Sequence, residues 1–231
     1  MSQIDPSHPA TRKRHAAAKR QARSQFNRWA RSYDRSLLSE LVFSPCIRAC
    51  QEEIARWRQQ RAEDSYRLLD VGCGTGNLLM ALAAEPHAAQ LIGLDYSEEM
   101  VRRFGDKIDP AEHGERLKVV HGDAEHLPFE DRSVDVLTCC NSFHHYPHQP
   151  AVVRELYRVL RPGGLLVLID GFRDNVIGWA IFDVAVAMVE GHVHHAAWSE
   201  VRDMITAAGF RHLTQRKMNV LAPLLVNVAR R

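Results

Sequence analysis

The chain has 231 residues, of which 45% are hydrophobic and 25% are charged, and its formal net charge is +2. This composition is that of an ordinary globular protein, and it excludes a collagen-like, low-complexity or wholly disordered chain. The charge is uneven, because residues 1–36 carry nine Lys or Arg and two Asp, a net of +7, which leaves −5 for the rest. We interpret residues 1–22 as a basic, disordered arm and residues 23–231 as one domain.

The cysteines and the apolar runs limit which kinds of site and which cellular location we expect. The five cysteines are an odd number and form no Cys-x-x-Cys pair, which argues against a disulfide framework and a structural zinc site. No run reaches the ~18–20 apolar residues of a membrane span, and no N-terminal segment has the apolar region of a signal peptide. We therefore expect a cytoplasmic protein with no membrane span, no metal site and no nucleic-acid partner.

The predicted elements begin with two helices. Aromatic and apolar side chains at positions 26, 29, 30 and 33 recur at helical spacing, and a second helix is predicted over residues 45–61, with Cys46 and Cys50 buried on one face. Beyond it, short apolar runs alternate with amphipathic segments, which is typical of βαβ units.

These units follow in order along the chain. The predicted strands of these units cover 67–71, 90–95, 117–121, 134–140 and 165–170. The predicted helices cover 76–84, 97–104 (capped by Ser97), 151–160 (ended by Arg-Pro-Gly-Gly), 176–189 and 199–208. Two polar-alternating runs, 212–219 and 224–229, are predicted to form an antiparallel hairpin at one edge of the sheet. The pattern predicts an α/β fold with a doubly wound, mainly parallel, seven-stranded Rossmann-like sheet.

A glycine-rich loop follows the first predicted strand. Asp70 precedes Gly72, Gly74, Thr75 and Gly76 in the sequence LLDVGCGTG. Glycines there allow a tight turn and let a ligand approach main-chain N–H groups at a helix start. A dinucleotide fingerprint needs a third glycine where this chain has Asn77, and the nearby carboxylate disfavours a pyrophosphate. The loop therefore favours a ligand with a cationic amino-acid moiety.

Further polar residues end the neighbouring strands. Asp95 can accept from both hydroxyls of a ribose, although NAD-binding folds share this feature. Asp123 can accept from an exocyclic amine such as that of adenine, beside the small apolar Ala124, and Asn141 completes a ring of residues at the same sheet edge.

Together these motifs resemble the class I S-adenosylmethionine-dependent methyltransferases, most closely the ubiquinone/menaquinone-biosynthesis C-methyltransferase-like (methyltransferase type 11) branch. The resemblance rests on LLDVGCGTG at 68–76, GLDYSEEM at 93–100, GDAEHLPF at 122–129, the strand before His144-His145 and LRPGGLLVLID at 160–170.

The resemblance implies S-adenosyl-L-methionine as cofactor and assigns roles to residues. Asp70 and the glycine loop would hold the methionine moiety, Asp95 the ribose, and Asp123 with Ala124 the adenine. Tyr96 and Asn141 would also bind the cofactor. Residues 23–62 would form a helical lid, with Tyr33 closing over the cofactor.

The expected activity is methyl transfer to a small, apolar or aromatic acceptor at O, N or C by in-line displacement, in which positioning supplies most of the catalysis. A base is needed only if the acceptor must lose a proton, and His145 is the candidate, against the alternative that it only packs. Two rival functions stay open: a catalytically inactive S-adenosylmethionine-binding protein and an NAD-dependent oxidoreductase.

Three other features keep alternative interpretations. The apolar residues 176–189 could form a substrate-pocket wall, a homodimer face or ordinary core. His192, His194 and His195 lack a partner at ligand spacing, so surface or substrate-pocket histidines are favoured over a metal site. Asp170 and Arg173 follow the fifth strand and could face the substrate, whereas Cys139 and Cys140 are interpreted as packing residues.

Overall fold

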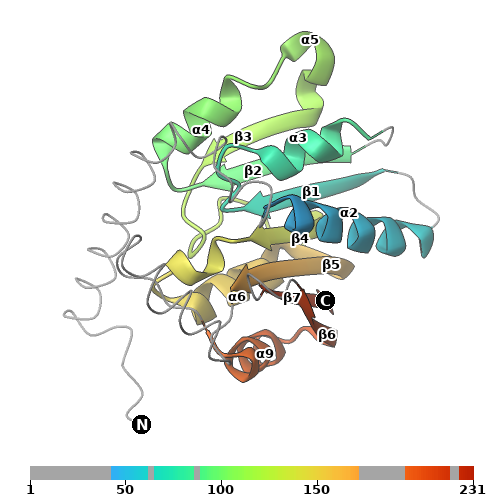
Figure 1. Ribbon diagram of the computed structural model, residues 1–231, viewed down its shortest axis with the longest axis vertical. Helices are drawn as coiled ribbons and strands as arrows, with labels where there is room; N and C mark the ends of the chain where they lie inside the picture. The colour runs from blue at the N-terminus through green and yellow to red at the C-terminus, as the bar shows by residue number, and fades with distance from the viewer. Residues whose placement is uncertain (1–42, 62–64, 86–88, 172–195, 219–223) are drawn as a thin grey trace.

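The computed structural model describes residues 43–61, 65–85, 89–171, 196–218 and 224–231. Within these ranges the strands form one sheet in the order β3-β2-β1-β4-β5-β7-β6 (Figure 1). The strands are β1 (Tyr66–Val71), β2 (Ala89–Asp95), β3 (Leu117–His121), β4 (Val134–Cys140), β5 (Leu160–Gly171), β6 (Arg211–Met218) and β7 (Leu224–Arg230). The first five pair in parallel, and β7 runs antiparallel between β5 and β6. The predicted fold class, with its C-terminal hairpin, is confirmed.

Helices cover both faces of this sheet. They are α2 (Ser44–Gln59), α3 (Asn77–Ala83), α4 (Glu98–Gly105), α5 (Pro110–His113), α6 (Gln149–Val159) and α9 (Trp198–Ala207), with 3-10 turns η3 (Gly114–Arg116) and η4 (Phe143–His145). None of the helices within the described ranges is both long enough and apolar enough to cross a membrane.

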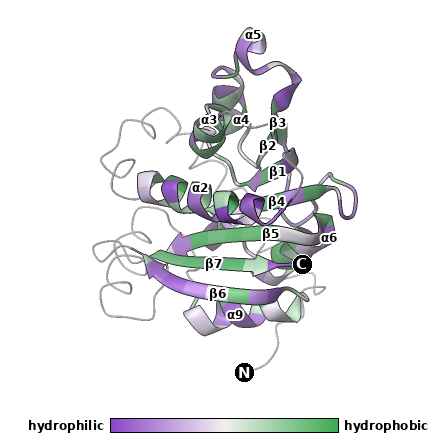
Figure 2. Cartoon of the chain, turned by 90° about the vertical axis from the view of Figure 1, so that its right-hand side faces the viewer, coloured by the Kyte–Doolittle hydropathy of each residue, from purple (hydrophilic) through white to green (hydrophobic). Residues whose placement is uncertain are grey.

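The core has two layers because side chains alternate along each strand. On β1, Leu68 belongs to the layer under α2 and α3, whereas Leu69 belongs to the layer under α6 and α9. The central strands are therefore buried on both faces, as a doubly wound parallel sheet requires. Figure 2 shows the change at the edge, where β7 is apolar and β6 is mostly polar.

Several predicted boundaries were wrong. The sheet pairing of β5 starts at Leu160 rather than residue 165, because Leu160 pairs with Val134 and Gly163 donates its N–H to the carbonyl of Arg231. The Arg-Pro-Gly-Gly sequence does end α6, but the pairing continues through it with an irregular register. The two hairpin strands also differ: β7 is largely buried inside the sheet, and only β6 alternates at the edge. α5 was not predicted.

Candidate functional site

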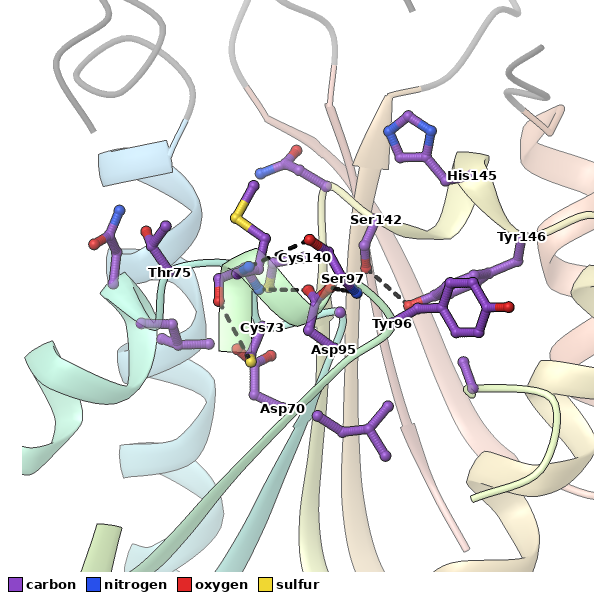
Figure 3. A pocket seen from close by; sticks show the side chains of 18 of the residues that line it. Asp70, Cys73, Thr75, Asp95, Tyr96, Ser97, Cys140, Ser142, His145 and Tyr146 are labelled. Atoms are coloured by element: carbon purple, nitrogen blue, oxygen red, sulfur yellow. Dashed lines mark hydrogen bonds between the residues drawn. The ribbon is translucent and has the colours of Figure 1, made fainter. Parts of the chain in front are cut away.

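A pocket lies at the carboxyl ends of the strands, where ligands bind in open α/β sheets. The strand order places β1 between β2 and β4, and the chain leaves β1 in one direction and β4 in the other. Many of the predicted site residues line this one pocket (Figure 3). They are Asp70, Gly72, Gly74, Thr75, Asp95, Tyr96, Asp123, Ala124, Asn141 and His145.

The glycine turn, residues 72–76, forms the floor of the pocket. Gly72 and Cys73 donate their N–H groups to the carbonyl of Leu94, with N···O distances of 2.8 and 3.0 Å. Gly72 has a φ of +75°, and a Cβ on it would lie 2.7 Å from the Tyr146 hydroxyl. Gly76 has a φ of +79° and lies against the Phe104 ring, where it precedes α3 rather than lining the pocket. These glycines therefore serve close packing and turn geometry.

Asp95 is held by the glycine turn itself. One carboxylate oxygen accepts from the Gly74 N–H at 2.8 Å, and the other accepts from the Ser97 N–H at 2.8 Å. Burial raises the pKa of this carboxyl, while the two N–H donors oppose that shift. Each carboxylate oxygen can accept a second hydrogen bond. Asp95 is thus oriented with acceptor capacity remaining for a ligand's hydroxyl groups.

Asp70 lies deeper and is only 3% exposed. Its carboxylate accepts from the Thr138 hydroxyl at 2.7 Å. Burial raises the pKa of Asp70 to about 7, the Thr138 hydrogen bond opposes the rise, and the neighbouring Asp95 charge adds to it. The ion pairs formed by the described residues include none with Asp70. A cationic ligand group would therefore stabilise its charged form.

Asp123 and Ala124 lie near the start of the loop between β3 and β4. The Asp123 carboxylate accepts from the Glu125 N–H at 3.0 Å, and α6 holds the loop through Glu155, which accepts from the Leu127 N–H at 2.8 Å. Asp123, Glu125 and His126 each offer a ligand atom within 4.8 Å of the others. Exposed acidic groups often gather in this way without a metal, so the cluster alone does not indicate a metal site.

The opposite wall is the exit turn, residues 141–147, which follows β4. The Ser142 hydroxyl donates to the Val71 carbonyl at 3.1 Å and lies 3.2 Å from the Tyr146 hydroxyl. Burial raises the pKa of Tyr146 well above its usual value, so this phenol stays neutral. Asn141, Ser142, His145, Tyr146 and Pro147 all line the pocket. The sequence reasoning missed Ser142 and Tyr146, although their position directly after a buried strand could have indicated them.

The start of α2 closes the pocket from a third direction. Phe43, Cys46 and Ile47 line it, and the Asn141 amide contacts the Cys46 sulfur at 3.3 Å. Cys46 and Cys50 are both buried, as predicted. Cys139 and Cys140 pack as predicted, one in each core layer. Cys140 also lines the pocket, which was not predicted, and its sulfur lies 3.3 Å from that of Cys50.

A buried pair behind the exit turn was not predicted as a pair. His144 Nδ1 lies 2.6 Å from one Asp170 oxygen, and the His144 N–H donates to the other oxygen at 2.9 Å. The rings of His144 and His145 lie 4.0 Å apart between centroids. Tyr33, Arg173, residues 176–189 and the histidines at 192–195 lie outside the described residues.

A comparison with protein families identifies the domain that builds this pocket. Residues 69–168 match a family model described as a methyltransferase domain. The chain contains a methyltransferase domain of the class I fold. The resemblance inferred from the sequence is thereby confirmed, and the matched range extends from β1 to β5.

Two similar proteins each match about two thirds or more of this chain. A demethylmenaquinone methyltransferase from Listeria welshimeri is 34% identical over 155 residues, which cover 67% of this chain and 64% of that protein. The chain thus spans less than two thirds of that relative's length. The crystal structure of YcgJ from Bacillus subtilis is 26% identical, with a TM-score of 0.58, and covers 71% of this chain and 69% of that one.

A more distant structure matches a larger share of the fold. Magnesium protoporphyrin IX methyltransferase from Synechocystis, solved with bound SAH, has a TM-score of 0.72 at 18% identity and covers 93% of this chain and 99% of that one. At this identity the likeness concerns the fold alone, and it extends beyond residues 69–168.

Proposed function

We propose that the chain transfers a methyl group from S-adenosyl-L-methionine to a small apolar or aromatic acceptor. The observation that carries this proposal is the convergence of Asp70, Asp95 and Asp123 around one pocket whose floor is the glycine turn. Asp95 would accept from the ribose hydroxyls, Asp123 would face the adenine amine, and Asp70 would face the cationic amino group. The raised pKa of buried Asp70 supports this fit, because a cation is the partner that such a carboxyl lacks in the described ion pairs.

The bound cofactor supplies a methyl group already activated by its sulfonium centre. The protein then has mainly to exclude water and align the acceptor, and such positioning can contribute ~7–11 kcal/mol. The apolar side chains of Phe43, Ile47 and Pro147 line the pocket and fit an apolar or aromatic acceptor. The names of relatives such as that from Listeria make demethylmenaquinone the first acceptor to test.

Calorimetry tests the cofactor assignment directly. We expect S-adenosylhomocysteine to bind and NAD to give no heat of binding. Binding of NAD alone would overturn the proposal. Methyl transfer is then measured with radiolabelled S-adenosylmethionine and demethylmenaquinone, oxidised and reduced, beside a simple phenol and a primary amine. Binding of S-adenosylhomocysteine with no transfer to any acceptor would favour a protein that binds the cofactor without catalysis.

His145 is the residue we propose as general base for an acceptor that must lose a proton. It lines the pocket on the exit turn, and histidine is the side chain that most often acts as a general base. We expect His145→Ala to lower turnover by about 10²-fold or more while S-adenosylhomocysteine still binds. His212→Asn, a change of an exposed histidine on β6, serves as the control. Full activity of His145→Ala would remove the base assignment.

A further inference from the structure

The exit turn has two residues that do not line the pocket. Phe143 and His144 point into the protein and are 2% and 9% exposed, while their neighbours Ser142 and His145 line the pocket. Phe143 belongs to the core layer under α6, and its carbonyl accepts from the Gln149 amide at 3.0 Å. The turn is therefore anchored at two adjacent positions, and the second anchor is polar.

The polar anchor joins the turn to the end of β5. Asp170 accepts from the main-chain N–H of His144 at 2.9 Å, and its other oxygen lies 2.6 Å from His144 Nδ1. That second oxygen also accepts from the Gly171 N–H at 2.7 Å. With these donors directed at it, the carboxylate is oriented by both strand and turn. The contact fixes the main chain and the ring of His144 together.

A buried polar pair constrains geometry more narrowly than an apolar contact of the same size. Hydrogen bonds need defined distances and angles, whereas apolar packing tolerates sliding and repacking. Breaking one partner leaves the other buried and unpaired, which disfavours alternative positions of the turn. We infer that Asp170 and His144 are a positioning pair, which holds the exit turn so that His145 and Tyr146 face the acceptor at the pocket.

This inference rests on the proposed function, because it gives the exit turn a role on the acceptor side of the pocket. The His144–Asp170 pair lies close to residues that line the pocket. The His144 ring is 4.0 Å from the His145 ring, and the Ser142–Tyr146 contact lies within the same turn. Displacements of about 1 Å in such a wall can lower turnover about 10²-fold. Cofactor binding depends on Asp95 and the glycine turn and should change little.

Two substitutions of His144 separate positioning from chemistry. In His144→Asn the amide nitrogen can take the place of Nδ1, so the contact with Asp170 is kept while the Nε2 position is lost. In His144→Gln the amide lies near the Nε2 position and the contact with Asp170 is lost. Asp170→Asn replaces one of the two carboxylate oxygens that face His144 with an amide nitrogen, so one of the two contacts loses its acceptor. His212→Asn is again the surface control.

The experiment measures turnover and affinity for S-adenosylhomocysteine in full-length protein. The His145 ring resonances are recorded separately, on the same protein saturated with S-adenosylhomocysteine. We expect His144→Asn to keep turnover within about threefold, and His144→Gln and Asp170→Asn to lose about 10- to 100-fold, at unchanged affinity. In these two variants the His145 signals should shift or broaden, whereas in His144→Asn they should stay in place. A merely structural role would lower the melting temperature without moving the His145 signals or the turnover of folded protein.

Three results would overturn the inference. Inactive but folded His144→Asn would mean that Nε2 takes part in the chemistry. Unchanged turnover and unchanged His145 signals in His144→Gln would mean that the pair positions nothing. Loss of cofactor affinity in parallel with turnover would mean that the His144–Asp170 pair supports the cofactor side of the pocket rather than the acceptor side. Failure of the proposed function is separate, since wild-type protein would then fail to bind S-adenosylhomocysteine or to methylate any acceptor. The His145 spectra of the wild-type and variant proteins would still test the pair in either case.

Discussion

The two sides of the pocket are held in place by different kinds of contact. On one side the main chain of the glycine turn orients Asp95 and carries it beside Asp70. On the other side the exit turn is held from behind by a side-chain pair that joins His144 to Asp170 across 26 positions of the chain. The first arrangement uses main-chain N–H donors across 21 positions of the chain, whereas the second depends on two particular side chains. We propose that the first arrangement serves cofactor binding and that the second positions the acceptor.

The largest effect is expected where the two sides touch. Gly72 lies against Ser142 and Tyr146, and its φ is +75°. Gly72→Ala should lower the free energy of unfolding by about 2–5 kcal/mol, from about 1–2 for the left-handed backbone and about 1–3 for the clash. It should also weaken S-adenosylhomocysteine binding, because the added Cβ displaces the glycine turn that forms the floor of the pocket.

Gly74→Ala is the matched control for this prediction. Gly74 also has a positive φ, +54°, but a Cβ there would meet nothing within 4 Å. Its cost should be the backbone contribution alone, about 1–2 kcal/mol. Urea unfolding of both variants measures the difference. Equal losses of stability would show that the Gly72 contact does not keep the two sides in register.

The second prediction concerns the side of the pocket that holds Asp95. Asp95→Ala should lower S-adenosylhomocysteine affinity by about 1–3 kcal/mol, because the ribose hydroxyls and the Gly74 and Ser97 N–H groups lose their acceptor. The matched control is Asp106→Ala, directly after the end of α4, where the exposed carboxylate pairs with Arg102. Calorimetry at fixed pH gives both affinities, and an unchanged value for Asp95→Ala would refute the ribose role.

The two sides of the pocket also differ in how well the sequence predicted them. The carboxylates at 70, 95 and 123 lie at or just after the carboxyl ends of predicted strands, so knowing the strands was enough to bring them to one edge. The pairing of His144 with Asp170 depends on how the ends of β4 and β5 meet in space, and no short motif encodes it. The pocket position of Cys140 was missed for a similar reason, because it depends on where α2 packs.

The fold was predicted better than its boundaries. Alternating strands and helices fixed the doubly wound class, since few topologies bury such apolar strands on both faces. The early start of β5 could not be predicted, because it depends on Leu160 pairing with Val134 rather than on local propensity. The burial of β7 likewise results from its place between β5 and β6.

The smallest predicted effect concerns the charge of Asp70. Burial raises its pKa to about 7 from the ordinary value of 3.8. The folded state therefore binds the proton more tightly than the unfolded state does, so stability is greatest below about pH 4 for this group and falls as pH rises to about 7. A cationic ligand has the opposite dependence, because it needs the charged carboxylate. S-Adenosylhomocysteine affinity should thus rise about tenfold between pH 6 and pH 8.

Asp70→Asn provides the control, since the amide keeps the shape and cannot ionise. In this variant the rise in affinity between pH 6 and pH 8 should disappear, and stability above pH 7 should exceed that of the wild type, because a buried charge has been removed. Calorimetry and urea unfolding at the same pH values measure the two quantities. If wild type and Asp70→Asn show the same pH dependence of affinity, Asp70 does not face the cationic group. The proposed cofactor side of the pocket would then be defined by Asp95 and the glycine turn alone.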